Sequence, residues 1–200
     1  MDGTLIDSTE VVASAFVATV RELGARSVDV AAVTAAYALR VPEVILAHLI
    51  GRNLNKGESD GFYERLRAAV VHPYAGVHET LVGIYGQWPM GVFTGSTLLS
   101  AQILLSRAGL INLVPVLVGG DEIERPKPAP DGILEVCHRL KQLPTGVAYI
   151  GDAAVDMAAA RAAGAVAVAA GWGHLYSADS SAHVTLTAPH QIHELLARPH

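Results

Sequence analysis

The stretch VAYIGDAAVD, residues 147–156, joins an apolar run, Val147 to Ile150, to the acidic residues Asp152 and Asp156. A short apolar run that ends at glycine is typical of a strand buried on both faces of a parallel sheet. The alanine-rich segment Ala153 to Ala163 has the composition of a helix. The stretch therefore predicts a strand, a turn and a helix, with two carboxylates where the strand ends.

The same alternation extends over the rest of the region from residue 73 to the end of the chain. Strands that alternate with helices form parallel crossovers, so we expect an α/β fold whose open sheet is covered on both faces and binds ligands at the strand carboxyl ends. The further strands are expected at Met90–Thr94, Leu113–Val118, Ala165–Ala169 and Val184–Leu186, and the further helices at Thr97–Ala108, Ala129–Leu140 and Gln191–Ala197.

Residues 10–72 have a different character, because their pattern is helical throughout. Four apolar residues recur at the spacing of one helix face before Gly24 ends the segment, namely Val12, Phe16, Val20 and Leu23. Further helices are expected at Asp29–Leu39, Pro42–Ile50 and Glu58–Val71. The pattern predicts an all-helical domain, residues 10–72, inserted into a core domain made of residues 1–9 and 73–200.

Composition excludes several classes of protein. The 200 residues are 51% apolar and 16% charged, which excludes general disorder, and no apolar run approaches the roughly 20 residues of a membrane span. The acidic N-terminus does not resemble an export signal, and the single Cys137 fits a reducing, cytoplasmic setting. The net charge of −5, without a basic cluster, argues against nucleic-acid binding. No feature decides an oligomeric state.

Polar clusters stand where the predicted strands end. Asp2 beside Gly3 suits a tight turn whose backbone approaches an anion or a metal, although such pairs also form ordinary turns. The segment Thr94-Gly95-Ser96 places hydroxyls and free amides at a helix start, which is an anion-binding arrangement. Alternatively, Ser96 or Thr97 caps that helix.

Lys127 and the acidic pair are more specific. Lys127 stands between Pro126 and Pro128, and a lysine on a stiffened backbone suggests a held anion, although a solvated lysine in a turn is the alternative. Asp152 and Asp156 share one helix face and repel each other unless a cation such as Mg²⁺ joins them; otherwise they are a helix cap and a surface acid. Together, hydroxyls, a lysine and carboxylates are the groups that phosphoryl transfer uses.

Four segments resemble the ordered motifs of the haloacid dehalogenase superfamily, in particular its phosphoglycolate-phosphatase-like branch. They are MDGTLIDS (1–8), VFTGS (92–96), RPKPAPDG (125–132) and YIGDAAVDMAAARAAGA (149–165). The resemblance implies a Rossmann-like core with a helical cap inserted after the first motif. It also implies Mg²⁺-dependent hydrolysis of a small phosphorylated metabolite through an aspartyl-phosphate.

The resemblance implies a role for each matching residue. Asp2 would be the general acid and base and would offer its main-chain carbonyl to the metal. Thr94 and the Gly95 amide would bind the phosphoryl group, and Lys127 would neutralise it. Asp152 would bind Mg²⁺, with Asp156 supporting the metal or its loop.

The chain departs from the family pattern at its start. The family's first motif begins with a nucleophilic aspartate two positions before the residue matched by Asp2, and that position falls immediately before Met1. The central strand that precedes this aspartate is absent too. We expect a start assigned too late, at an internal methionine. The alternative is a chain that begins here and is a catalytically impaired binding protein; either way, the chain as given should be nearly inactive, because no other residue of the motif replaces the nucleophile.

Substrate choice is expected to lie in the helical domain. Tyr37, Arg40 and His48 are candidates, and Arg40 suits a second anionic group on the substrate, although a solvated helix end is its alternative. Trp172 and His174 are expected at the entrance.

Other classes of protein fit the residues less well. A phosphomutase of the same family shares every motif and stays open as an alternative. A receiver domain places its acidic pair first in the chain, and a dehalogenase does not need the metal-binding acids. His190 and His193 share a helix face without an evident third ligand, so a surface pair is expected.

Overall fold

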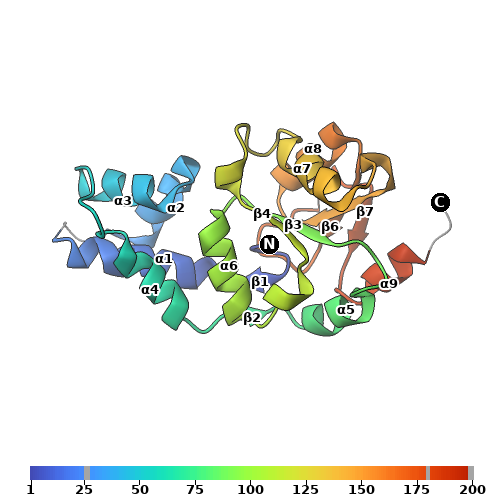
Figure 1. Ribbon diagram of the computed structural model, residues 1–200, viewed down its shortest axis with the longest axis horizontal. Helices are drawn as coiled ribbons and strands as arrows, with labels where there is room; N and C mark the ends of the chain where they lie inside the picture. The colour runs from blue at the N-terminus through green and yellow to red at the C-terminus, as the bar shows by residue number, and fades with distance from the viewer. Residues whose placement is uncertain (25–27, 179–180, 198–200) are drawn as a thin grey trace.

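The computed structural model describes residues 1–24, 28–178 and 181–197. A helical insertion (α1 to α4 with η1) forms one end of the molecule, and an α/β region forms the other (Figure 1). Helix α6 lies between them in the view. Within the described residues, no helix combines the length and apolar character that a membrane crossing needs.

The helical insertion follows the predicted pattern with shorter ends. Its helices are α1 (Thr9–Glu22), α2 (Val30–Ala36), α3 (Pro42–Ile50) and α4 (Asp60–Ala68). The expected helix Asp29–Leu39 changes to a 3₁₀ turn, η1 (Tyr37–Leu39), before Arg40 leaves the helical conformation with a φ of 67°. Phe16 and Phe62 stack at 4.3 Å between ring centroids in the insertion's core.

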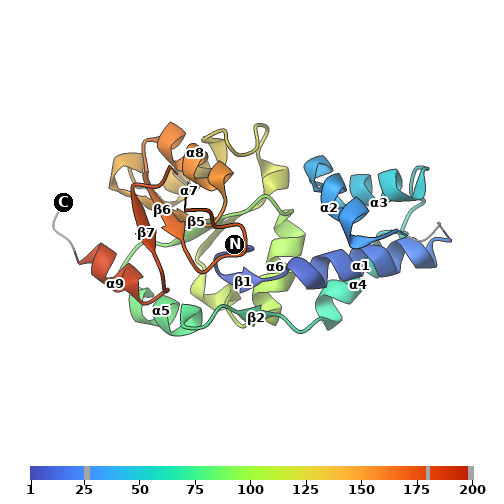
Figure 2. The same ribbon diagram turned by 180° about the vertical axis from the view of Figure 1, so that it is seen from behind.

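Two short strands connect the insertion to the α/β region. Strands β1 (Ile6–Asp7) and β2 (His72–Pro73) pair antiparallel, so the chain enters and leaves the insertion side by side (Figure 2). Two-residue strands show no periodicity, which is why the sequence did not predict them.

The α/β region confirms the predicted class and the parallel crossovers. Its strands are β3 (Gly91–Phe93), β4 (Val116–Val118), β5 (Ala148–Gly151), β6 (Val166–Ala170) and β7 (Val184–Leu186). Its helices are α5 (Val77–Ile84), α6 (Leu98–Arg107), α7 (Asp131–Leu140), α8 (Ala154–Ala163) and α9 (Gln191–Leu196). The short 3₁₀ helices are η2 (Ile111–Leu113), η3 (Gly120–Glu122) and η4 (Pro144–Gly146). All of the strand pairs in this region are parallel, and α5 is the helix that the sequence analysis left out.

The sheet is interrupted between β3 and β5. Strand β3 pairs with β4, strand β5 pairs with β6, and no strand lies between β3 and β5 in the described part of the chain. A largely apolar cavity of about 360 Å³ is lined by both strands and by α5, α7 and α9. The parallel strands of the described residues therefore form two pieces that flank a slot, which we call the β3–β5 slot.

The start of the chain lies beside the carboxyl ends of β3 and β5. Met1 is buried and also lines the β3–β5 slot, and Asp2 forms an isolated parallel bridge with Ile6. Thr94 follows β3 directly, and Asp152 follows β5. Three motifs that are far apart in the sequence therefore meet at one edge of the sheet, as expected for a ligand site in this class of fold.

Candidate active site

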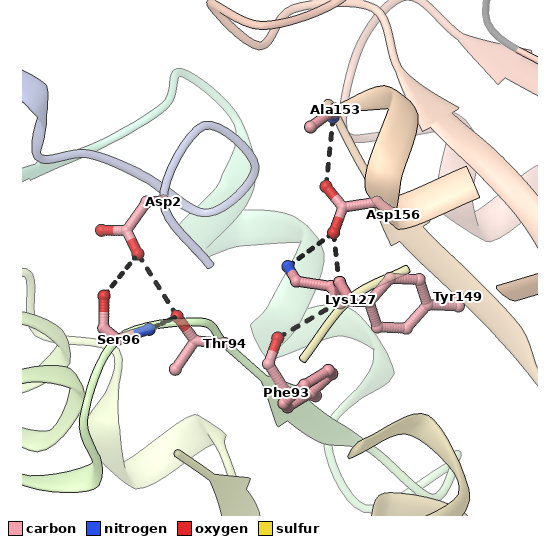
Figure 3. Close-up of polar contacts among 8 residues, drawn as sticks. All are labelled: Asp2, Phe93, Thr94, Ser96, Lys127, Tyr149, Ala153 and Asp156. Atoms are coloured by element: carbon pink, nitrogen blue, oxygen red, sulfur yellow. Dashed lines mark hydrogen bonds and ion pairs between the residues drawn. The ribbon is translucent and has the colours of Figure 1, made fainter. Parts of the chain in front are cut away.

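Three hydroxyl groups surround the Asp2 carboxylate. Ser96 Oγ and Thr94 Oγ1 donate hydrogen bonds to Asp2 Oδ2 at 3.2 and 3.3 Å (Figure 3). Ser8 Oγ donates to Oδ1. Half-buried Asp2 is thus an oriented acceptor at the end of β3.

The loop after β3 is held by backbone contacts. Thr94 N donates to Val118 O at 3.1 Å, and Ser96 N donates to Thr94 Oγ1 at 3.2 Å. Thr97 caps α6 by accepting from Ser100 N, which leaves Ser96 free to face Asp2. The cap alternative therefore applies to Thr97 alone. Gly95 is exposed and a Cβ there would meet open space, so its amide is accessible to an anion.

Lys127 forms a buried ion pair with Asp156. Lys127 Nζ lies 2.6 Å from Asp156 Oδ1, with side-chain exposures of 17% and 8%. Asp156 Oδ2 accepts from Ala153 N at 3.1 Å, and Tyr149 Oη donates to Asp156 Oδ1 at 3.4 Å (Figure 3). Lys127 Nζ also lies 5.5 Å from the centre of the Phe93 ring, within range of a cation–π interaction.

The ion pair shifts the pKa of both partners. Burial alone would raise the pKa of Asp156, but the charge and hydrogen bond of Lys127 outweigh burial and lower it below its ordinary 3.8. Burial alone would lower the pKa of Lys127, whereas Tyr149, Asp156 and Asp2 together raise it. Lys127 is thus held as an ammonium group with Asp2 in electrostatic range.

Asp152 is a buried carboxylate of a different kind. It is 3% exposed, and Oδ2 accepts from Leu175 N at 3.0 Å. A Cβ on Gly3 would lie 2.1 Å from that oxygen, so the turn after Asp2 presses against the carboxylate. No lysine or arginine pairs with Asp152 in the described residues, and His174 Nδ1 lies 4.0 Å away.

Gly3→Ala is expected to lower stability by at least about 2 kcal/mol, because the left-handed backbone costs an L-residue ~1–2 kcal/mol and the new methyl group collides with Asp152. Gly3 has a φ of +72°. The midpoint of thermal unfolding, measured by circular dichroism, should fall by roughly 4–8 °C. Gly109→Ala is the matched control, since Gly109 has the same φ of +72° with nothing within 4 Å. Equal losses in the two variants would contradict the contact.

The donor set at Asp152 fits a hard divalent cation. A buried carboxylate without a basic partner is unfavourable unless a cation neutralises it. The described residues bring no three His, Cys, Asp or Glu side chains together at a metal-binding distance. This is compatible with Mg²⁺, which commonly takes one or two carboxylates and completes its shell with substrate phosphate and water.

Asp156 has a different neighbour from the expected metal. From the sequence, Asp156 is expected either to share a cation with Asp152 or to be a surface acid, because no lysine or arginine is its neighbour in the chain. Lys127 supplies the counter-charge instead, from a loop 29 residues away. Both oxygens of Asp156 accept hydrogen bonds, so the residue is arranged to hold Lys127.

The buried amino group of Met1 lies where these charges converge. Burial lowers the pKa of this group, and four side chains act on it electrostatically: Asp2, Lys127, Asp156 and Asp152. Charged side chains of three motifs therefore act on this one amino group.

The candidates in the helical insertion lie in different settings. The Tyr37 Oη is buried and has no hydrogen-bond partner among the described residues, and burial together with the Asp2 charge raises its pKa to about 12. The Arg40 guanidinium donates to the main-chain carbonyls of Gly120 and, at 3.1 Å, Ile123. His48 is exposed on α3.

The loop after β6 contacts the first motif. Trp172 Nε1 donates to Thr4 O at 2.9 Å, and His174 lies beside Thr9, the first residue of α1. Sequence reasoning missed Ser8 and Tyr149 as polar neighbours of the site. Ser8 is the last residue of the first motif and could have been considered for that reason, whereas Tyr149 resembles an ordinary residue of a buried strand.

Comparisons with known proteins agree with the sequence motifs. A phosphoglycolate phosphatase of Chromobacterium violaceum is 29% identical over an alignment 219 positions long, which covers 98% of this chain and 93% of that protein. A phosphoglycolate phosphatase of Xanthomonas campestris is 30% identical over an alignment 209 positions long, which covers 100% of this chain and 95% of that relative.

The fold has a close counterpart among solved structures. The crystal structure of a protein predicted to be a phosphoglycolate phosphatase, from Haemophilus somnus, matches with a TM-score of 0.76 at 20% identity, over 98% of this chain and 95% of that one. The family model described as haloacid dehalogenase-like hydrolase matches residues 1–170. These matches confirm the resemblance in the motifs, and the chain belongs to the haloacid dehalogenase-like hydrolase family.

Proposed function

We propose that the protein is a phosphatase that hydrolyses the phosphate ester of a small metabolite at the carboxyl ends of β3 and β5. The observation that carries the proposal is that the hydroxyl-bound Asp2, the buried Lys127–Asp156 ion pair and the buried Asp152, which pairs with no lysine or arginine of the described residues, lie together at the carboxyl ends of β3 and β5. The relatives named phosphoglycolate phosphatase support this activity.

The phosphoryl group would bind between the loop after β3 and Lys127. The Thr94 hydroxyl and the Gly95 amide are donors for its oxygens, and the Lys127 ammonium neutralises their charge. Asp156 positions Lys127 through the 2.6 Å contact between Lys127 Nζ and Asp156 Oδ1, and Tyr149 Oη donates to that same oxygen at 3.4 Å. A fixed cation loses little free energy to reorganisation when the phosphoryl charge develops.

Asp2 would move the proton. Its Oδ2 gives a proton to the ester oxygen of the leaving group and later removes one from the attacking water. Thr94 and Ser96 donate to this same oxygen when no substrate is bound, and their hydroxyls can rotate toward the phosphoryl oxygens instead.

Asp152 and the main-chain carbonyl of Asp2 would hold Mg²⁺. The support is that Asp152 is buried, that no lysine or arginine of the described residues pairs with it, and that it contacts the turn after Asp2. When bound, Mg²⁺ neutralises phosphoryl oxygens and orients the phosphate for attack.

We propose that the nucleophile is an aspartate joined directly to Met1, at the end of a strand that fills the β3–β5 slot. Three observations support this proposal. The Met1 amino group is buried among the charged side chains of the site. The edges of β3 and β5 that face the slot have no strand partner in the described residues. The slot is lined mainly by apolar groups from helices on both faces.

Restoring the residues encoded directly upstream of Met1, which gives what we call the extended protein, is expected to raise the unfolding midpoint by roughly 10 °C. Two or three apolar side chains entering the slot would contribute about 1.5–3 kcal/mol each, and a domain of this size gains roughly 2–4 °C per kcal/mol. Differential scanning calorimetry measures the shift. An extension of equal length made of glycine and serine is the control, and an equal rise in that control would contradict the proposal.

We also propose that residues 10–72 are a cap domain over the site, with residues 1–9 and 73–200 as the core domain. The insertion reaches the core through Arg40, which contacts Gly120 and Ile123. Gly120 lies against Gly95 O, because a Cβ there would be 2.4 Å from that oxygen. Tyr37 and Arg40 would recognise the substrate, and the unpartnered Tyr37 hydroxyl supports a small polar one such as phosphoglycolate or a sugar phosphate.

The test is phosphate release by the extended protein from a panel of monoesters, including 2-phosphoglycolate, hexose 6-phosphates and p-nitrophenyl phosphate, with Mg²⁺. We expect turnover of at least one metabolite ester with a kcat/KM above that for p-nitrophenyl phosphate. Isomerised sugar phosphate without phosphate release would favour the phosphomutase alternative. A folded extended protein that releases phosphate from none of them overturns the proposal and favours a binding protein.

A further inference from the structure

We propose that His174 is a positioning residue that ties both connections of the helical insertion to the loop holding Asp152. This inference rests on the proposed function, since it assigns a role within the same site. His174 lies between β6 and β7, outside the four family-like motifs. Its two ring nitrogens contact different segments of the chain.

His174 contacts two hydroxyl groups. His174 Nε2 lies 3.2 Å from Thr9 Oγ1, and His174 Nδ1 lies 3.3 Å from Tyr74 Oη. A neutral imidazole has one donor and one acceptor, and each hydroxyl can serve in either role. Both hydrogen bonds can therefore form at the same time in either tautomer.

The two hydroxyls lie on the connections of the insertion. Thr9 is the first residue of α1 and is separated from the end of β1 by Ser8 alone, and Tyr74 directly follows β2. Tyr74 N also donates to Leu5 O at 3.0 Å, which continues the pairing of β1 with β2. Thr9 and Tyr74 thus stand on the two connections through which the chain enters and leaves the insertion, where movement of the insertion would have to occur.

The loop that carries His174 also shapes the candidate metal site. Leu175 N donates to Asp152 Oδ2, and a Cβ on Gly173 would lie 2.2 Å from Gly3 O and 2.3 Å from Asp152 Cβ. Residues on either side of His174 are therefore packed against Asp152 and the turn after Asp2. A movement of either connection would therefore be transmitted to Asp152 through the backbone of residues 173–175.

His174 accordingly links the position of the insertion to the orientation of the Asp152 carboxylate. When the insertion sits over the site, both connections hold His174, and the amide of Leu175 stays directed at Asp152. When His174 releases them, the insertion moves without constraint from this loop and Asp152 loses its fixed orientation.

The test compares His174→Ala with the pair Thr9→Val and Tyr74→Phe in the extended protein. His174→Ala should lower kcat roughly tenfold, as expected from the loss of about two hydrogen bonds, and change KM less than twofold. Thr9→Val with Tyr74→Phe should reproduce the loss, and the triple variant should be no worse than His174→Ala. His138→Ala is the control, because His138 is an exposed histidine on α7 and its loss also removes one imidazole.

Hydrogen exchange gives a readout that does not depend on turnover. In the chain as given, His174→Ala should speed amide exchange in residues 5–9 and 72–76 and leave α7 unchanged. Unchanged exchange in these connections overturns the proposal, as does a loss of kcat that is additive with the hydroxyl variants. If the extended protein hydrolyses no monoester but exchange responds as expected, the proposed function fails while the link between His174 and the connections stands.

Discussion

Lys127→Met is expected to destabilise the protein by about 3 kcal/mol, because it leaves Asp156 as a buried carboxylate without its counter-ion. The two side chains are 17% and 8% exposed, so water screens the pair poorly. The unfolding midpoint should fall by roughly 6–12 °C for a domain of this size. Thermal unfolding followed by circular dichroism measures the loss, and Lys56→Met, at an exposed lysine, is the control.

The pH dependence of the same variant separates loss of charge pairing from loss of packing. In the parent, the pKa of Asp156 is below its ordinary 3.8, so its contribution to stability is present above about pH 4 and is lost as the pH falls below that value. In Lys127→Met, burial without a cation raises the Asp156 pKa, so lowering the pH from 7 to 5 should increase the variant's stability. Adding Asp156→Asn should recover part of the loss at pH 7. A pH-independent deficit would contradict the ion-pair explanation.

Asp2→Asn is expected to lower kcat of the extended protein by about 10²–10⁴-fold, because an amide cannot exchange the proton that hydrolysis requires. Asparagine keeps the size of the side chain and an oxygen that accepts from Thr94 or Ser96, so the unfolding midpoint should change little. Steady-state kinetics with saturating substrate measures the effect.

Asp29→Asn is the matched control for Asp2→Asn. Asp29 caps α2 in the insertion by accepting from Ala32 N at 2.8 Å, and asparagine caps helices equally well. It should therefore keep the parental kcat. If Asp2→Asn also retained parental kcat, Asp2 would not be the proton-transferring group.

The sequence pattern predicted much of the fold and which polar residues follow the strands. Apolar residues spaced along one helix face identified α1 to α4, and short continuous apolar runs identified β3 to β6. Helix α5 was left out although Val77, Leu81 and Ile84 recur on one face. The connections β1 and β2 have two residues each, too few for any period.

Side-chain partners were harder to predict than positions. Asp156 was assigned to a metal because Lys127 is remote in the sequence, and only the fold brings the two within 2.6 Å. From the sequence, Arg40 suits either a substrate anion or a solvated helix end, and only the structure shows that its guanidinium also contacts carbonyl groups of the loop around η3. Each of these charged side chains suits more than one kind of partner, and the partners that lie beside it are known only from the folded structure.

The measurement that tests the account most directly is phosphate release by the extended protein with Mg²⁺, compared with the same protein in EDTA and with Asp152→Asn. The account predicts turnover of a phosphate monoester that EDTA abolishes, that added Mg²⁺ restores, and that Asp152→Asn loses while remaining folded. Equal phosphate release by the parent and by folded Asp152→Asn, or release that EDTA does not affect, would contradict it.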